Sequence, residues 1–300
     1  MSRAAHNGHA PVGLVGIGLM GSALASRLID RDLRVVGYDI NPSRCLILSE
    51  LGGRSVPDAA AVAACDRILL SLPDSDAVEQ TLAAIRHDLR PGQVVIDTST
   101  GDPGRAAAIG QRLARLDVSY LDATVSGSSA QVYTGDVTIM VGGTEDAFLK
   151  CRDLFSLLAR RTFHVGPCGS GSTMKLVTNL VLGLNRAALA EGLAFAKAMG
   201  LDLPQALAVL RESMAYSRVM DTKGEKMVSG DFEAQARLSQ HLKDVRLILE
   251  AGTGTGTDLP LSHTHRELLE AAEAAGLGHL DNSAIIRVFD RAASGNGKRP

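Results

Sequence analysis

Residues Val12–Gly21, with the sequence VGLVGIGLMG, decide the fold of this chain. The apolar run Val12–Gly16 predicts a short buried strand, and the residues from Leu19 to Ile29 predict a helix. The turn between them has the spacing G-x-G-x-x-G, which permits a tight bend, close approach of the backbone to a pyrophosphate, and close packing of helix on strand. We therefore expect a phosphate-binding turn at the start of the helix, made of Gly16, Ile17, Gly18, Leu19, Met20 and Gly21.

A carboxylate follows at the distance that such a turn requires. Arg34–Tyr38 (RVVGY) predicts a second strand, and Asp39 ends it 18 residues after Gly21. A carboxylate there accepts hydrogen bonds from the adenosine ribose and repels a 2′-phosphate, which favours NAD over NADP. Arg44 is close enough in sequence to weaken this repulsion, so NADP stays open. The alternative interpretation is a glycine-rich turn followed by an unrelated aspartate.

The alternation of strands and helices continues to about residue 167. Apolar runs predict further strands, with helices between them, at 67–72, 93–97, 119–122, 137–141 and 162–165. This order predicts an α/β fold with a Rossmann-type, doubly wound, mostly parallel sheet over residues 11–167. Loops at the carboxyl ends of such strands carry ligands, so Leu72, Pro73 and Thr100 are candidate cofactor contacts. Ordinary loop and capping chemistry is the alternative for each of them.

A short hydroxyl-rich segment follows the strand predicted at Ser119–Asp122. The segment covers residues 123–129 (ATVSGSS) and is predicted to form a turn. Backbone N–H groups and hydroxyls in such a turn can hold an anion such as a carboxylate. This turn is therefore a candidate site for an acidic substrate.

Periodicity changes after Gly166-Pro167, and only helices are predicted beyond it. The first long helix is predicted from Ser172 to about Met199, although Gly183 and Gly192 inside it each cost about 1 kcal/mol in helix propensity. That cost predicts that another helix packs closely against both glycines. Further helices are predicted at 203–214, 220–228, 238–251, 263–275 and 283–291, with a flexible connector, GTGTGTD, at 252–258. We expect an all-helical domain at 168–293 and flexible tails at 1–10 and 294–300.

The segment Gly169–Asn179 (GSGSTMKLVTN) places two polar residues on the first turns of the long helix. Lys175 and Asn179 are four residues apart and so share one face of an otherwise apolar helix. This pair is suited to proton transfer. The alternative is that Lys175 extends along apolar surface to reach water.

The composition argues against several classes of function. The chain has 300 residues, a formal net charge of −2 and 3% aromatic residues, so neither a basic surface nor stacking side chains are indicated for nucleic acid. Its four cysteines are scattered without a CxxC pair, so neither a zinc site nor a disulfide framework is expected. His263 and His265 diverge on a helix, and no metal is expected. Because we find neither a signal peptide nor a membrane-spanning run, we expect a cytoplasmic enzyme with reduced thiols and no membrane contact.

Together, these motifs resemble the β-hydroxyacid dehydrogenase family, which includes 3-hydroxyisobutyrate dehydrogenase and tartronate semialdehyde reductase, with 6-phosphogluconate dehydrogenase as a larger relative. Four signatures match in the family's order: GIGLMG at 16–21, DATVSGS at 122–128 with GDVTIMVGG at 135–143, GSGSTMKLVTN at 169–179, and LKD at 242–244. The resemblance implies a Rossmann domain joined by a long helix to an all-helical domain. It also implies NAD or NADP as cofactor, a small hydroxy acid or semialdehyde as substrate, and a homodimer or homotetramer formed through the helices.

The resemblance also implies roles for individual residues. Lys175 matches the family's catalytic lysine, and Asn179 matches the asparagine beside it. Ser126 and Gly127 match the turn that holds the substrate carboxylate. Leu72, Pro73 and Thr100 match the family's cofactor contacts. Lys243 matches the lysine that closes over cofactor and substrate. The sequence departs from the family's usual DAPVSGG at Thr124 and Ser128. Ser128 brings a further hydroxyl to the turn and is included among the substrate contacts.

The implied reaction is the reversible, NAD-dependent oxidation of a short-chain 3-hydroxy acid to its 3-oxo acid or semialdehyde, with Lys175 as general acid and base. One alternative is a tartronate semialdehyde, succinic semialdehyde or glyoxylate-type reductase that uses NADPH. A second is an imine reductase, although a residue other than lysine usually occupies the position of Lys175 in those enzymes. A third is a non-catalytic NAD-binding sensor. The sequence does not decide the substrate.

Overall fold

The computed structural model describes residues 10–289 and divides the chain into two compact units, with the boundary between Lys175 and Leu176. Apart from residue 10, the tails predicted at 1–10 and 294–300 lie outside the described residues. Within the described range, none of the helices is both long and apolar enough to cross a membrane.

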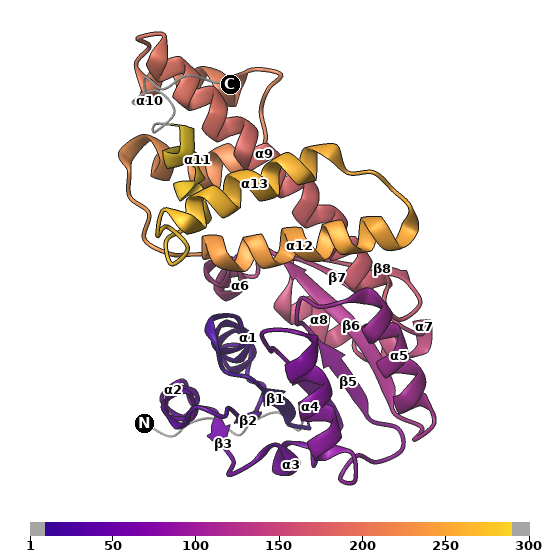
Figure 1. Ribbon diagram of the computed structural model, residues 1–300. Coiled ribbons are helices and arrows are strands. Elements are labelled where there is room, and N and C mark those ends of the chain that lie inside the picture. Colours follow the sequence, from indigo (N-terminus) through magenta and orange to yellow (C-terminus); the bar gives the residue numbers. More distant parts are fainter. Residues whose placement is uncertain (1–9, 290–300) are drawn as a thin grey trace. The chain divides into compact units, whose positions relative to one another are not determined.

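The first unit is built on one eight-stranded sheet with the order β3-β2-β1-β4-β5-β6-β7-β8 (Figure 1). All neighbouring strands pair in parallel except β6 and β7. The strands are β1 Val12–Val15, β2 Val35–Tyr38, β3 Arg54–Ser55, β4 Arg67–Leu70, β5 Val94–Asp97, β6 Ser119–Ser126, β7 Thr138–Gly142 and β8 Arg161–Gly166. The prediction of a doubly wound, mostly parallel sheet is confirmed. The strand order reverses between β1 and β4, which is the place where such sheets bind ligands.

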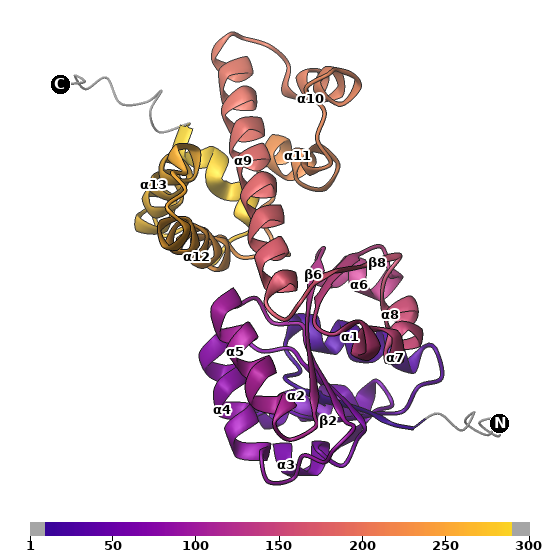
Figure 2. The same cartoon turned by 90° about the vertical axis from the view of Figure 1, so that its right-hand side faces the viewer.

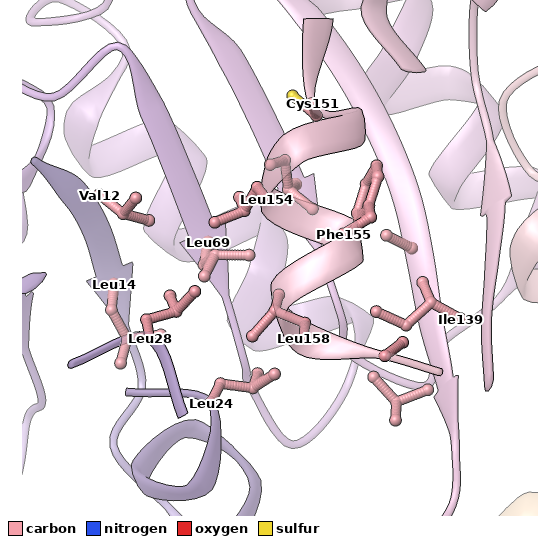
Figure 3. Packing of buried hydrophobic residues seen from close by; sticks show 14 of the residues in the cluster. Val12, Leu14, Leu24, Leu28, Leu69, Ile139, Cys151, Leu154, Phe155 and Leu158 are labelled. Carbon is pink, nitrogen blue, oxygen red and sulfur yellow. The ribbon is translucent and has the colours of Figure 1, made fainter. Parts of the chain in front are cut away.

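Helices cover both faces of this sheet. They are α1 Leu19–Ile29, α2 Pro42–Glu50, α3 Ala59–Val62, α4 Ser75–Ile85, α5 Pro103–Ala114, α6 Ser129–Thr134, α7 Glu145–Lys150 and α8 Arg152–Leu158. Because side chains alternate along a strand, Leu14 packs with α1 and α8, whereas Val15 packs with α4 and α5. Figure 3 shows the first of these two clusters, in which Leu24 and Leu28 of α1 lie near Leu158 of α8.

Strand β6 is longer than the sequence predicts. The strand was expected to end at Asp122, but it continues to Ser126, because residues 122–126 pair with 138–142 of β7. The predicted turn is therefore reduced to Gly127 and Ser128, and α6 begins directly after it. The helical segment expected between the strands at 137–141 and 162–165 is divided in two at Cys151.

The second unit is helical throughout its described part. The long helix α9, Ser170–Ala198, begins in the first unit and continues into this one (Figure 2). The other helices are α10 Leu203–Glu212, α11 Val219–Ser229, α12 Leu238–Thr255, α13 Pro260–Ala274 and the 3-10 helix η1 Asn282–Ile285. They share a core with one face of α9 that includes Leu193, Leu207, Val245 and Leu269.

Two predictions for these helices need correction. Close packing is observed at Gly183, where an added Cβ would lie 2.6 Å from His241 Nε2 and from His265 Cε1, but Gly192 has nothing described within 4 Å of such a Cβ. Gly192 lies on the exposed face of α9. The prediction of a flexible connector at 252–258 is also wrong in part. Helix α12 continues through Thr255, and its C-cap is Gly256, with a φ of 70°.

A buried ion pair ties the end of the helical unit to α11. Lys223 Nζ lies 2.9 and 2.8 Å from the two carboxylate oxygens of Asp281. The same carboxylate accepts hydrogen bonds from the backbone N–H groups of Gln235 and Ala236 and from the Ser283 hydroxyl. Burial lowers the pKa of Lys223. Burial alone would raise the pKa of Asp281, but the pairing with Lys223 and the hydrogen bonds from Ser283 together outweigh it and lower that pKa.

Candidate active site

The three glycines of the G-x-G-x-x-G turn have different surroundings. Gly16 has a φ of 92°, which favours glycine, and a Cβ on it would collide with the carbonyl oxygen of Ser71. A Cβ on Gly21 would collide with the carbonyl oxygen of Gly16, so this glycine lets α1 pack against the turn. No described atom lies within 4 Å of a Cβ built on Gly18. The turn therefore leaves open space at the glycine that would approach a ligand.

The start of α1 is suited to an anion. Within the described part of the chain, no side chain caps this helix end, and its first turn carries no acidic residue. Free N–H groups and the helix dipole at such an end favour a phosphate. Asp39 lies beside the turn, because its Oδ2 accepts a hydrogen bond of 2.6 Å from the backbone N–H of Ile17. Its Oδ1 accepts from the N–H of Asn41 at 2.8 Å, and each carboxylate oxygen keeps a lone pair for a ribose hydroxyl.

The loops after β4 and β5 are joined by side chains. The hydroxyl of Ser99 accepts a hydrogen bond of 2.9 Å from the N–H of Leu72, and so fixes the Leu72-Pro73 loop against the segment that carries Thr100. Asp97, at the end of β5, accepts from the N–H of Ser99 and from the hydroxyl of Tyr120. Burial raises the pKa of Asp97. These loops follow neighbouring strands, so the candidate cofactor contacts lie at one edge of the sheet.

Lys175, the last residue of the first unit, has a defined hydrogen-bond acceptor. Its Nζ donates to the backbone carbonyl of Val125 at 2.6 Å, and the side chain is half-buried. Val125 precedes Ser126 and Gly127, so the lysine amine lies beside the turn that is expected to hold a carboxylate. This contact brings together, within one unit, two motifs that are about 50 residues apart in sequence.

Asp122 on β6 holds the beginning of the lysine-bearing helix. Its Oδ1 accepts from the N–H of Gly169 at 2.9 Å, and its Oδ2 accepts from the N–H of Ser172 at 2.7 Å. Asp122 is 1% exposed, and burial raises its pKa although these N–H groups favour the carboxylate. The Thr124 hydroxyl donates to the carbonyl of Gly171 at 2.9 Å, which gives a structural role to the residue that departs from the family pattern.

In the turn after β6, Ser128 caps a helix, which is a role that the sequence did not predict. Gly127 has a φ of 148° and no room for a side chain, because a Cβ there would lie 2.5 Å from Val137 Cγ1. Ser128 is the N-cap of α6 and forms a capping box with Gln131. Its hydroxyl and its N–H are both engaged with Gln131. Ser126 is half-buried and lies at the end of β6.

The helical unit contains the remaining predicted residues. Asn179 is buried, and its Nδ2 donates to Asp244 Oδ2 at 3.0 Å. Lys243 Nζ lies 3.9 Å from Asp244 Oδ1, so one carboxylate links the two predicted residues. Asp244 was not among the predicted site residues. Its signal was present in the sequence, because it is the last residue of the LKD signature.

The interior of the helical unit also holds polar side chains that the sequence did not indicate. Arg186 is 3% exposed, and its Nε and Nη1 have no hydrogen-bond partner within the described residues. Burial lowers the pKa of Arg186 to about 10 and, together with the Arg186 charge, lowers that of His265 to about 4. His241 is also buried, with its ring centroid 5.2 Å from that of His265.

The doubly wound sheet, the open glycine turn and Asp39 define a dinucleotide-binding protein of the Rossmann class. Comparison with protein families identifies the family within this class. Residues 11–166 match the NAD-binding domain of 6-phosphogluconate dehydrogenase, and residues 169–289 match the NAD-binding family of NADP-dependent 3-hydroxyisobutyrate dehydrogenase. The chain belongs to the β-hydroxyacid dehydrogenase family.

Individual relatives agree with this assignment. The chain is 32% identical to 2-(hydroxymethyl)glutarate dehydrogenase of Eubacterium barkeri, over 93% of this chain and 95% of that protein. It is 31% identical to 2-hydroxy-3-oxopropionate reductase of Escherichia coli, over 94% of this chain and 98% of that protein. A solved structure of 3-hydroxyisobutyrate dehydrogenase from Salmonella typhimurium superposes with a TM-score of 0.86 at 28% identity, covering 94% of this chain and all of the other. The protein is therefore an NAD(P)-dependent oxidoreductase that acts on the CH–OH group of hydroxy acids.

Proposed function

We propose that this enzyme interconverts a short-chain 3-hydroxy acid and its 3-oxo acid or semialdehyde, with NAD as the preferred cofactor and Lys175 as general acid and base. The observation that carries this proposal is the contact of Lys175 Nζ with the carbonyl of Val125, directly before Ser126 and Gly127. A substrate whose carboxylate binds the Ser126-Gly127 turn would bring its C3 oxygen toward the lysine amine.

When bound, the nicotinamide ring supplies the hydride chemistry. In the reducing direction, the Lys175 ammonium donates a proton to the carbonyl oxygen as that oxygen gains negative charge. In the oxidising direction, the neutral amine removes the hydroxyl proton. The carbonyl of Val125 holds the lysine side chain in one orientation. Asn179, on the same face of α9, orients the substrate hydroxyl or the lysine itself, and Lys243 closes over cofactor and substrate.

The preference for NAD rests on Asp39. Its two hydrogen bonds to the backbone hold the carboxylate beside the glycine turn, where a 2′-phosphate would meet a fixed negative charge. The pyrophosphate is assigned to the N-terminus of α1, and the loops at Leu72, Pro73 and Thr100 are assigned to the nicotinamide half of the cofactor. Arg44 is the residue that could offset the repulsion by Asp39.

The names of the relatives suggest the substrates to test. The panel contains 3-hydroxyisobutyrate, 2-(hydroxymethyl)glutarate and glycerate with the matching semialdehydes or oxo acids, each with NAD(H) and with NADP(H), followed by nicotinamide absorbance. We expect turnover of at least one pair, with a higher kcat/KM for NAD(H).

The variant Lys175→Ala tests the role of the lysine. We expect it to lower kcat at least ~10²-fold, the usual contribution of general acid–base catalysis. Binding of NADH should be unchanged, because none of the assigned cofactor contacts is altered. A variant with near-normal turnover would contradict the assignment of Lys175.

A further inference from the structure

We propose that Asp122 is a positioning residue for catalysis: it holds the first turn of α9 against strand β6, and so places Lys175. This inference rests on the proposed role of Lys175 as the proton donor and acceptor. Three residues of β6 form hydrogen bonds at successive points along the start of α9 and the residue before it. They are Asp122 at Gly169 and Ser172, Thr124 at Gly171, and Val125 at Lys175.

The hydrogen bonds of Asp122 join a carboxylate to backbone N–H groups at the start of a helix, and such bonds are strong. The first N–H groups of a helix have no partner within the helix, and a carboxylate both satisfies them and complements the positive end of the helix dipole. At other helices of this unit that function belongs to a residue just before the helix, such as Asp74 at α4 or Asp102 at α5. At α9 it belongs to Asp122, which is 47 and 50 residues away from its two donors.

The surrounding backbone is built to permit this close contact. A Cβ on Gly142, which pairs with Asp122 across β6 and β7, would lie 2.7 Å from the N–H nitrogen of Gly171. A Cβ on Gly171 would lie 2.8 Å from the nitrogen of Gly142 and from the carbonyl oxygen of Met140. The helix start therefore rests directly on the two strands, and a displacement there is transmitted to Lys175 one turn later.

Asp122 differs in this respect from a second buried acid at the same level of the sheet. Asp97 pairs with Asp122 in the register of β5 and β6 and is also buried. Within the described residues its hydrogen bonds come from Ser99 and Tyr120, which lie outside α9. Variants at the two positions therefore separate a general effect of replacing a buried acid from an effect on the lysine.

The test uses Asp122→Asn in the full-length enzyme. The amide keeps the shape but replaces one acceptor oxygen with a donor, so one of the two N–H bonds is lost. We expect kcat to fall about 10- to 100-fold, the order of loss that a displacement of about 1 Å of a catalytic group can cause, while NADH affinity stays at the wild-type value. Asp97→Asn should instead change the KM for the cofactor, because it supports the loop of Ser99 and Thr100.

A double-mutant cycle with Lys175→Ala gives a result that a purely structural role would not produce. If Asp122 acts through Lys175, Asp122→Asn causes no further loss of residual activity in the Lys175→Ala background. Additive losses, or a wild-type kcat in Asp122→Asn, would overturn the proposal. Thr124→Val, which removes the bond to Gly171, should lower kcat in the same direction by a smaller factor, and Thr124→Ser should restore it. This pair answers the question even if Asp122→Asn does not fold.

A second readout is independent of turnover. Labelling of Lys175 by trinitrobenzenesulfonate, followed by peptide mass spectrometry, should become several-fold faster in Asp122→Asn than in wild type, because the amine is no longer held against Val125. If the wild-type enzyme turns over no hydroxy acid but this labelling rate changes, the proposed function fails and the positioning stands. If turnover is normal and labelling is unchanged, the positioning fails and the function stands.

Discussion

The buried arginine of the helical unit leads to a prediction that is opposite to the usual effect of a core substitution. Arg186 is fully enclosed, and two of its nitrogen atoms have no hydrogen-bond partner within the described residues. Asp281 and Asp244 stabilise its charge, but burial outweighs them and lowers the pKa of Arg186 from its ordinary value to about 10. This difference corresponds to about 3 kcal/mol by which the folded protein disfavours the charged form.

Replacement of Arg186 by methionine removes the charge and keeps an unbranched side chain. We therefore expect Arg186→Met to raise the free energy of unfolding at pH 7 by about 1 to 3 kcal/mol, within the range observed when buried charges are replaced by apolar residues. The sign follows from the lowered pKa of a cation: the cost is fully present below pH 10 and is relieved only as the pH rises through that value.

The assay is urea-induced unfolding followed by far-UV circular dichroism. The matched control is Arg246→Met, because Arg246 lies in the same unit with its side chain 60% exposed and paired with Glu270 at 3.0 Å. A surface pair of this kind contributes less than about 1 kcal/mol, so the control should be neutral or slightly destabilised. If Arg186→Met is destabilised by more than the control, the guanidinium has compensating partners and the reasoning from its unpartnered nitrogens is wrong.

Three further predictions follow from the structure. Gly18→Ala should fold normally but weaken NADH binding, whereas Gly21→Ala should lower the melting temperature, because only the second collides with the backbone of the turn; NADH fluorescence titration and thermal unfolding distinguish them. Asp281→Asn should reduce the loss of stability that occurs as the pH falls below about 4. The lowered pKa of Asp281 stabilises the folded protein at pH values above the pKa of this group in the unfolded chain, and this contribution disappears on acidification. Phe195→Glu, at a side chain 65% exposed on α9, should reduce the mass measured by light scattering if the chain assembles through its helices, and an unchanged mass would exclude that face.

Local sequence signals were sufficient for the parts of the fold that depend on local structure. The glycine turn with its flanking strand and helix, and the alternation that gives a parallel sheet, were predicted and are confirmed. The errors occur where tertiary pairing overrides the local signal. Strand β6 passes beyond Asp122 because β7 pairs with it, and a sequence of small hydroxyl-bearing residues gives no indication of that partner.

The contacts that define the candidate site were not predictable in the same way. The sequence indicated Lys175, Asn179 and Lys243, and their catalytic roles stay a prediction. It could not indicate that Asp244 bonds Asn179 or that Asp122 bonds the start of α9, because both contacts join residues about 50 or more positions apart. A carboxylate at a helix start is usually found in the adjacent sequence, so a search near Gly169 would not find Asp122.

The position of Lys175 at the boundary of the two units gives a reason for the length and continuity of α9. Lys175 is the last residue of the first unit, and Asn179 belongs to the second. In an α-helix, residues four apart are about 6 Å apart along the axis and lie on one face. The spacing of Lys175 and Asn179, the residues proposed for proton transfer, is therefore set by the geometry of one helix. Within the first unit, Asp122 accepts hydrogen bonds from the backbone at the start of this helix, and within the second unit Asp244 accepts a hydrogen bond from the Asn179 side chain. Loss of the Asp244 carboxylate should consequently lower kcat, because Asn179 loses the acceptor that holds its side chain, and a wild-type kcat in Asp244→Asn would contradict this role.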